Sequence, residues 1–186
     1  MDQNIEMEKV YWVAFELNVQ DWGVLAKGDD ANLMQLHAGN SDLGLSPQIG
    51  LTTAVKKADA RGNWGREFEV WVLYSTEAVP DKRRVNIVPF NIGAIPFGRW
   101  SSYVFKFRQS LANGMLQVWV DGRQVVNYRG PLGFNPTPGF KDYVKFGYYN
   151  WTRPRSSRKL LMRSMVVVAD STNKYGPEAL SAFARE

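Results

Sequence analysis

The segment "DYVKFGYYNW", which begins at Asp142, carries polar side chains at every second position. Successive side chains of a β-strand point to opposite faces of the strand. One face of this segment would therefore carry Tyr143, Lys145, Gly147, Tyr149 and Trp151. A tyrosine hydroxyl can transfer a proton, a lysine ammonium can bind an anion, and a glycine leaves room beside both. This pattern predicts a surface that contacts a ligand.

The only histidine, His37, lies in a second segment of the same kind, "MQLHAG". In a strand, Gln35 and His37 share one face, whereas Met34 and Leu36 share the other and suit a hydrophobic core. A lone histidine on a strand is more often structural than functional. The pairing of two polar strand faces, each with groups that bind anions or transfer protons, is what indicates a site.

The elements that must position these residues are strands, because apolar residues recur with a period of two along most of the chain. Asp121-Gly122 predicts a two-residue hairpin turn, because both turn positions favour positive φ. The sequence allows a short helical turn near residues 89–97, and the tail over residues 176–186 suits either a helix or a frayed end. The strands are expected within residues 10–19, 32–39, 47–55, 66–75, 99–109, 114–130, 142–151 and 163–170. Many short strands predict an all-β fold, an antiparallel β-sandwich of the jelly-roll (concanavalin-like) type, as one domain over residues 1–186.

Composition favours an anionic partner and excludes several common chemistries. The chain of 186 residues has a net charge of +5, from 23 basic and 18 acidic residues. One histidine and no cysteine exclude an ordinary zinc site. The sequence has neither a phosphate-binding loop nor a dinucleotide-binding motif, so no cofactor is predicted. A structural calcium ion at loop aspartates is chemically feasible but is not predicted. No apolar run is long enough to span a membrane, and the acidic N-terminus does not resemble a signal peptide.

The two polar segments together resemble a signature of jelly-roll polysaccharide lyases. In the alginate lyases of polysaccharide lyase family seven the pattern is Gln-(Ile/Val)-His, followed later by Tyr-x-Lys-x-Gly-x-Tyr-Asn. This sequence has "QLH" and, about a hundred residues later, "YVKFGYYNW". The heparin lyase I and glucuronan lyase families have a related layout, to which "GRWSSYVFKFRQSLANGMLQVWVDGRQVVNYRG" is also similar. The resemblance covers roughly residues 8–170.

The resemblance implies a role for each matching residue in the β-elimination of a uronate polymer. Gln35 would contact the uronate carboxylate, and His37 would be the general base or a second carboxylate-binding group. Lys145 would support the negative charge, and Tyr149 would be the general acid, or both base and acid. Relatives usually carry an Arg-x-Glu strand upstream, whereas this chain begins "MDQNIEMEKVYW". Either that element is truncated, another arginine replaces it, or the site is inactive.

A wider set of residues is expected to line the same groove and bind the polymer. Gln117 and Trp119 share the outward face of their strand and would extend the groove floor, while Arg108 and Arg153 are the candidates to replace the missing arginine. The full predicted set of binding residues is Gln35, Lys145, Tyr143, Asn150, Trp151, Arg108, Gln117, Trp119 and Arg153.

Three functional classes are consistent with these residues. The first is a polysaccharide lyase acting on an acidic polysaccharide, expected to be a monomer with no nucleic-acid or membrane partner. The second is a non-catalytic, lectin-like carbohydrate-binding module on the same fold. The third, a nucleic-acid-binding β protein, explains the charge but not the matched set of polar residues. The lyase is the preferred interpretation, in an extracellular setting as a secreted or phage-borne enzyme. Which uronate polymer it cleaves, and by which stereochemistry, stays open.

Overall fold

The structure is a computed structural model that describes residues 4–23, 31–39, 47–53, 66–81, 83–135, 141–150, 158–170 and 175–178. The described residues form ten β-strands. These are β1 (Val10–Val19), β2 (Asn32–His37), β3 (Ile49–Thr53), β4 (Glu67–Tyr74), β5 (Asn86–Ala94), β6 (Trp100–Arg108), β7 (Met115–Val120), β8 (Arg123–Arg129), β9 (Tyr143–Tyr149) and β10 (Leu160–Ala169).

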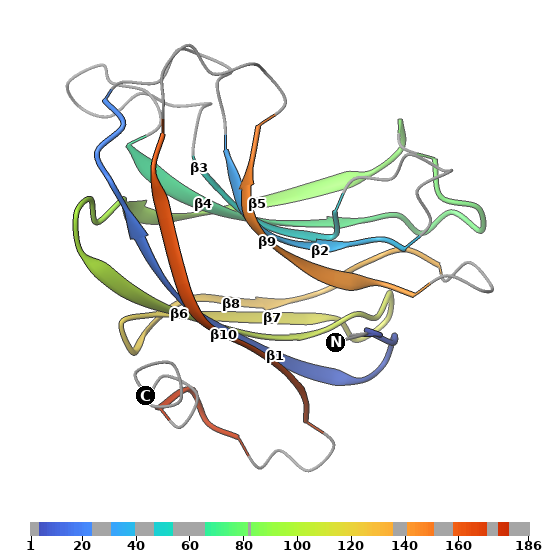
Figure 1. Ribbon diagram of the computed structural model, residues 1–186. Helices are drawn as coiled ribbons and strands as arrows, with labels where there is room; N and C mark the ends of the chain where they lie inside the picture. Colours follow the sequence, from blue (N-terminus) through green and yellow to red (C-terminus); the bar gives the residue numbers. More distant parts are fainter. Residues whose placement is uncertain are drawn as a thin grey trace.

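The strands form two antiparallel sheets stacked face to face (Figure 1). We call the sheet with the order β5-β4-β3-β2-β9 the front sheet; it is the upper sheet in Figure 1. The sheet with the order β10-β1-β6-β7-β8 is the back sheet, the lower one in Figure 1. We use "outer face" for the side of each sheet that is turned away from the other sheet. The predicted all-β, antiparallel sandwich of the jelly-roll type is therefore confirmed.

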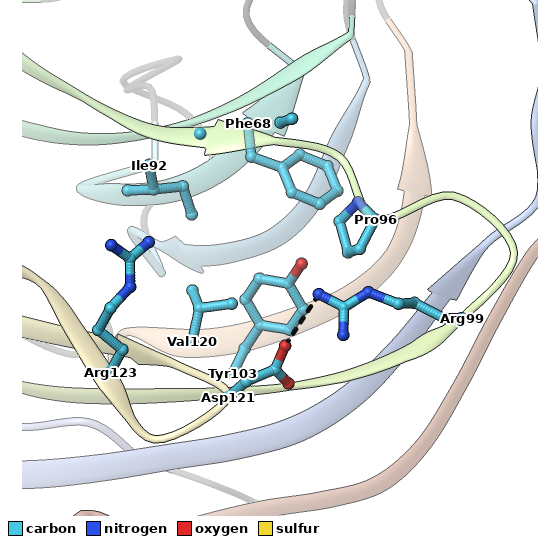
Figure 2. Close-up of a pocket in the computed structure, with 10 residues that line it drawn as sticks. Phe68, Ile92, Pro96, Arg99, Tyr103, Val120, Asp121 and Arg123 are labelled. Atoms are coloured by element: carbon cyan, nitrogen blue, oxygen red, sulfur yellow. Dashed lines mark ion pairs between the residues drawn. The ribbon is translucent and has the colours of Figure 1, made fainter.

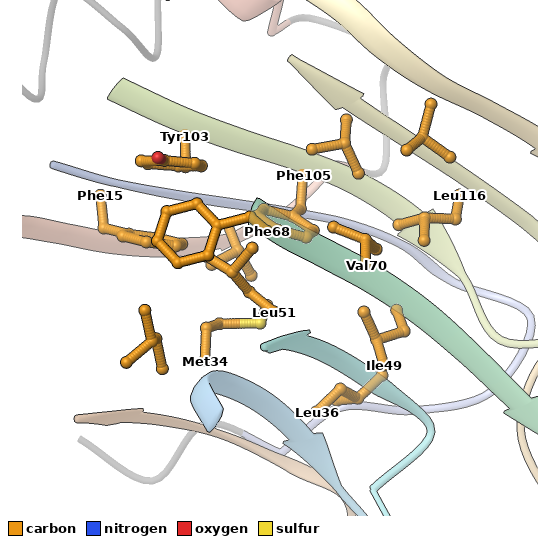
Figure 3. Close-up of a cluster of buried hydrophobic side chains, with 14 of the residues drawn as sticks. Phe15, Met34, Leu36, Ile49, Leu51, Phe68, Val70, Tyr103, Phe105 and Leu116 are labelled. Carbon is orange, nitrogen blue, oxygen red and sulfur yellow. The ribbon is translucent and has the colours of Figure 1, made fainter. Parts of the chain in front are cut away.

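The hydrophobic core lies between the sheets and is built by the apolar half of each alternating strand. Met34, Leu36 and Phe68 of the front sheet pack toward Phe15 and Phe105 of the back sheet, and all five are essentially buried (Figure 3). Burying a side chain of this size stabilises the fold by about 1.5–3 kcal/mol. Since the apolar residues of β2 point inward, its polar residues must point to the outer face of the front sheet.

The hairpin turn confirms the expectation from Asp121-Gly122, because these residues have φ values of 50° and 79°. The helical turn that the sequence allows near residues 89–97 is not formed there, because β5 runs through most of this range. Pro89 fits there since β5 is an edge strand, where a residue without an N–H group is tolerated. Of the expected C-terminal helix, only Pro177 and Glu178 are both described and helical. No helix within the described residues is long and apolar enough to cross a membrane.

Candidate active site

The pairing of β2 with β9 brings the two polar segments together. In this antiparallel ladder, His37 lies opposite Tyr143, Gln35 lies opposite Lys145, and Asn32 lies opposite Tyr149. Directly opposed residues point to the same face of a sheet. The structure therefore brings Gln35, His37, Tyr143, Lys145 and Tyr149 together on the outer face of the front sheet.

A β-bulge at Leu33 adds Asn32 to this face. The register of β2 shifts between Asn32 and Met34 against both of its neighbours, and Leu33 and Met34 are both packed in the core. Asn32 and Gln35 are three residues apart, so strict alternation would place them on opposite faces. The extra residue of the bulge reverses this and returns Asn32 to the face that carries Gln35. Sequence reasoning missed Asn32 for this reason.

A cavity of about 260 Å³ opens between β2 and β9. Gly147 contributes to the space, because a Cβ atom built there would meet no atom within 4 Å. Its φ of 134° also favours glycine, so a larger residue here would be strained. The cavity is lined by Asn32, Leu33, Met34, Gln35, Lys145, Phe146, Gly147, Tyr148 and Tyr149.

Two polar atoms of this cavity are buried without a hydrogen bond. Asn32 is 3% exposed and Gln35 is 5% exposed. The Oδ1 atom of Asn32 and the Nε2 atom of Gln35 have no hydrogen-bond partner within the described residues. Leaving a buried polar group unpaired costs about 1–3 kcal/mol, so such groups usually have a structural partner or a ligand. Both residues line the cavity, so an unpaired acceptor and an unpaired donor lie at its wall.

One hydrogen bond indicates which ring nitrogen of His37 carries a proton. Its Nδ1 atom lies 2.7 Å from the carbonyl oxygen of Ala38. A carbonyl oxygen only accepts hydrogen bonds, so Nδ1 carries the proton, and in the neutral ring Nε2 then has a free lone pair. The imidazole stacks on Tyr143 with ring centroids 5.5 Å apart, and the Lys145 ammonium lies 5.1 Å from the centroid of the same tyrosine ring.

Asp142 fixes the ends of the strands that carry these groups. Its carboxylate accepts hydrogen bonds from the backbone N–H of Gly39 at 3.0 Å and from the side-chain amides of Gln48 at 2.9 Å and Gln109 at 2.6 Å. These contacts join the residues that follow His37 to the residue that precedes Tyr143. The two rings are therefore positioned by a polar network as well as by the strand ladder.

The structure does not bring Arg108, Gln117 and Trp119 to this face, which corrects the prediction that they extend the same groove. All three lie in the back sheet, on its outer face, so the core separates them from the β2–β9 cavity. The Trp119 ring stacks on Trp12 with centroids 5.7 Å apart. Alternation shows which face of its own strand a residue occupies, but not to which sheet that strand belongs.

The polar groups of Arg108 and Gln117 are also directed to neighbours within the back sheet. The Arg108 guanidinium donates to the carbonyl oxygen of Asn113 at 2.6 and 3.0 Å. The Gln117 amide donates to the side-chain oxygen of Asn127 at 3.3 Å. Arg108 therefore does not replace the missing arginine.

Three further predicted residues lie at or beyond the end of β9. Asn150 follows the strand and its amide donates to the Tyr148 hydroxyl at 3.1 Å, and it is not among the residues that line the cavity. Trp151 and Arg153 lie outside the described residues.

Lys145 is the cation among the described residues that line the cavity, and no arginine is among them. The N-terminal segment, in which the related lyases carry an arginine, lies near the start of β9. Ile5 forms an isolated antiparallel bridge with Asp142, so this segment approaches the outer edge of β9. Its described residues, 4–9, include no arginine.

A second cavity, of about 330 Å³, lies between the two sheets rather than on an outer face (Figure 2). Phe68 and Ile92 of the front sheet face Tyr103 and Val120 of the back sheet across it. Arg99 and Asp121 form an ion pair of 3.3 Å at its rim. Burial raises the pKa of Tyr103 well above its usual range, so this hydroxyl stays protonated. His37 and Tyr143 do not line the β2–β9 cavity, but they lie on the same outer face, next to the pair of Gln35 and Lys145. The β2–β9 cavity together with this face is the candidate active site.

Known proteins support the same conclusion. The model of a family described as "Polysaccharide lyase" matches residues 1–165. This chain belongs to the polysaccharide lyase family. A search of curated proteins found no significant match to this polysaccharide lyase.

Solved structures share the fold of this polysaccharide lyase at low sequence identity. The endo-β-1,4-glucuronan lyase from the fungus Trichoderma reesei superposes with a TM-score of 0.68 at 14% identity, over 89% of this chain and 71% of that one. Alginate lyase A1-II′, a member of polysaccharide lyase family 7, superposes with a TM-score of 0.56 at 13% identity, over 90% of this chain and 65% of that one. A heptameric SAP-like pentraxin from Limulus polyphemus has a TM-score of 0.50 at 12% identity, over 98% of this chain and 73% of that one. At identities this low the likeness shows the fold, and a shared fold does not by itself determine activity.

Proposed function

We propose that this polysaccharide lyase cleaves an anionic, uronate-containing polysaccharide by β-elimination at the β2–β9 cavity. The observation that carries the proposal is the register of β2 with β9, which places Gln35, His37 and Tyr149 on one face with Lys145 beside them. The family match favours a lyase over the lectin-like alternative.

The reaction requires three functions from the site. The proton at C5 of the uronate moves to a base, the C–H electron pair forms the C4–C5 double bond, and the C4–O bond breaks. The departing oxygen takes a proton from an acid. Because the carboxylate on C5 is already negative, donors that bind it stabilise the charge that develops as the C5 proton leaves.

The described side chains suit these functions. Nε2 of Gln35 and the ammonium of Lys145 are donors for the carboxylate, and Oδ1 of Asn32 can accept a hydrogen bond from a sugar hydroxyl. His37 and Tyr149 stand at the two ends of the site. His37 lies opposite Tyr143, which is six residues from Tyr149 along β9, so His37 and Tyr149 are roughly 16–20 Å apart along the strands. A sugar seated over Gln35 would lie between them, with Nε2 of His37 as the base and the Tyr149 hydroxyl as the acid.

A panel of uronate polymers tests the function. We expect a rise in ultraviolet absorbance from the unsaturated product on at least one of glucuronan, alginate or a uronate-containing glycosaminoglycan. The similarity to glucuronan and alginate lyases makes these the first polymers to test. Such polymers occur outside cells, and we propose an extracellular setting for this chain. Binding to one polymer with no absorbance change on any would instead support the lectin-like alternative.

Lys145→Ala is expected to weaken substrate binding, with an effect that depends on salt. Removing the only cation among the described residues that line the cavity should raise KM roughly 3- to 10-fold at low ionic strength, and this factor should shrink as salt screens the charge. Lys106→Ala is the matched control, because Lys106 lies over Trp12 on the back sheet and should leave KM unchanged. An equal loss at all salt concentrations would argue against a charge interaction with the polymer.

Replacing the buried amides is expected to change stability and activity in opposite directions. Gln35→Met and Asn32→Leu keep the approximate size of each side chain and remove a buried polar atom that lacks a partner. The free energy of unfolding should stay level or rise by about 1 kcal/mol, whereas kcat/KM should fall. Denaturant melts and initial rates on the same samples measure both. Lower stability in both variants would show that the amides are structural.

A further inference from the structure

Trp71 occupies the same outer face as the candidate active site, two strands away from Gln35. Lys145 lies opposite Gln35, Gln35 opposite Gly50, and Gly50 opposite Trp71, so these four residues form one row across β9, β2, β3 and β4. Phe68, Val70 and Val72 of β4 are buried in the core, which leaves Trp71 on the outer face.

The absence of a side chain at Gly50 lets the Trp71 indole lie over β3. A Cβ atom at Gly50 would fall 2.3 Å from Cζ2 and 2.4 Å from Cε2 of the indole, which no real contact permits. The six-membered ring of the indole therefore covers Gly50, the residue directly beside Gln35. Trp71 also packs against a small buried cluster of Ala38, Leu73 and Phe134, which holds the ring in place.

We propose that Trp71 is the platform for the sugar unit next to the one bound at Gln35. This inference rests on the proposed function and extends it to a second subsite. The indole over β3 is about one strand spacing, roughly 5 Å, from Gln35, which is comparable with the length of one sugar ring. The apolar C–H face of one pyranose ring would pack on the indole, whereas Gln35 and Lys145 would bind the carboxylate of the adjacent sugar unit.

Charge distinguishes the two subsites. No lysine or arginine occurs in β3, β4 or β5, and the neighbours of Trp71 on the outer face of β4 include Glu69. The contact made by the indole itself is non-ionic, so its contribution to binding should change little with salt, in contrast to the contact at Lys145. A polymer that crosses the strands along this row meets a cation at one end and an aromatic ring at the other.

Oligosaccharides of glucuronan and alginate with increasing chain length test the inference. KM is measured for chains of increasing length, at low and high salt, for wild type, Trp71→Ala and Gly50→Ala. Wild type should prefer longer chains, because only these reach both subsites. Trp71→Ala should raise KM roughly tenfold on long chains, by the same factor at both salt concentrations. It should leave KM unchanged on the shortest chains that are cleaved.

Gly50→Ala keeps the indole but displaces it, so it should show the same dependence on length. Trp100→Ala, on the outer face of the back sheet beneath Arg163, is the matched control and should behave as wild type. If Trp71→Ala raises KM equally for chains of all lengths, Trp71 has a structural role and the proposal is overturned. If KM is unchanged at every length, the proposal is also overturned. If wild type binds but does not cleave, the same comparison is made on dissociation constants, and only the lyase proposal fails. If wild type neither cleaves nor binds these chains, both proposals fail.

Discussion

Tyr149→Phe is expected to lower kcat by about 10²–10⁴-fold, the usual contribution of a positioned acid or base. The substitution removes only the hydroxyl, which is the proposed proton donor to the departing oxygen. Tyr149 is 48% exposed, so its hydroxyl is not needed to fill the core. The melting temperature should therefore stay within a degree or two of wild type. Initial rates from product absorbance, together with a thermal melt of the same sample, measure both quantities.

Tyr128→Phe is the control for this experiment. Its hydroxyl donates to the carbonyl oxygen of Pro131 at 2.7 Å, and Tyr128 belongs to the back sheet. The control should lose some stability and keep its turnover, which is the reverse of the result for Tyr149→Phe. A Tyr149→Phe enzyme with near-normal turnover would rule out the proposed role of this tyrosine.

His37→Gln is expected to be as inactive as His37→Ala, with kcat reduced by about 10²–10⁴-fold. Glutamine can still donate a hydrogen bond to a carboxylate but cannot take up the C5 proton near neutral pH. The pair of variants therefore separates the two roles left open for His37. If His37 only binds the carboxylate, His37→Gln should retain most of kcat and raise mainly KM, with Tyr149 serving as both base and acid.

The pH profile of the wild type gives a second readout for His37. A base must be unprotonated before the reaction, so kcat/KM of the wild type should fall as the pH is lowered. The hydrogen bond from Nδ1 to Ala38 means that the catalytic proton is expected on Nε2. A kcat/KM that does not fall as the solution is made acidic would contradict a histidine base.

Alternation in the sequence placed most of the candidate site on the correct face of its strands. Met34 and Leu36 point into the core, so Gln35 and His37 point outward, and the same logic places Lys145 and Tyr149 outward on β9. This worked because burying one face of a strand gives a strong and local signal with a period of two. The turn at Asp121-Gly122 was equally readable, because few residues tolerate positive φ at both positions.

Two features were hidden from the sequence because each interrupts that local rule. The bulge at Leu33 inserts one residue into β2, and an insertion of this kind changes the face of every residue before it. Asn32 therefore joined the site unexpectedly. The strand β5 was missed because Pro89 and Gly93 are poor strand formers, and only its position at the sheet edge accommodates the proline.

The sequence by itself determined the fold class, the inward and outward faces of most strands, and the residue types that suit β-elimination. Only the tertiary structure decided which tryptophan lies beside the site. Trp71 and Trp119 sit in similar alternating segments and both point outward, yet β4 joins the front sheet and β7 joins the back sheet. Strand pairing depends on contacts between residues far apart in the chain, whereas alternation reports only on a strand and its own two faces. The aromatic surface expected at Trp119 is therefore provided next to Gln35 by Trp71, across a glycine whose importance appears only when the strands are paired.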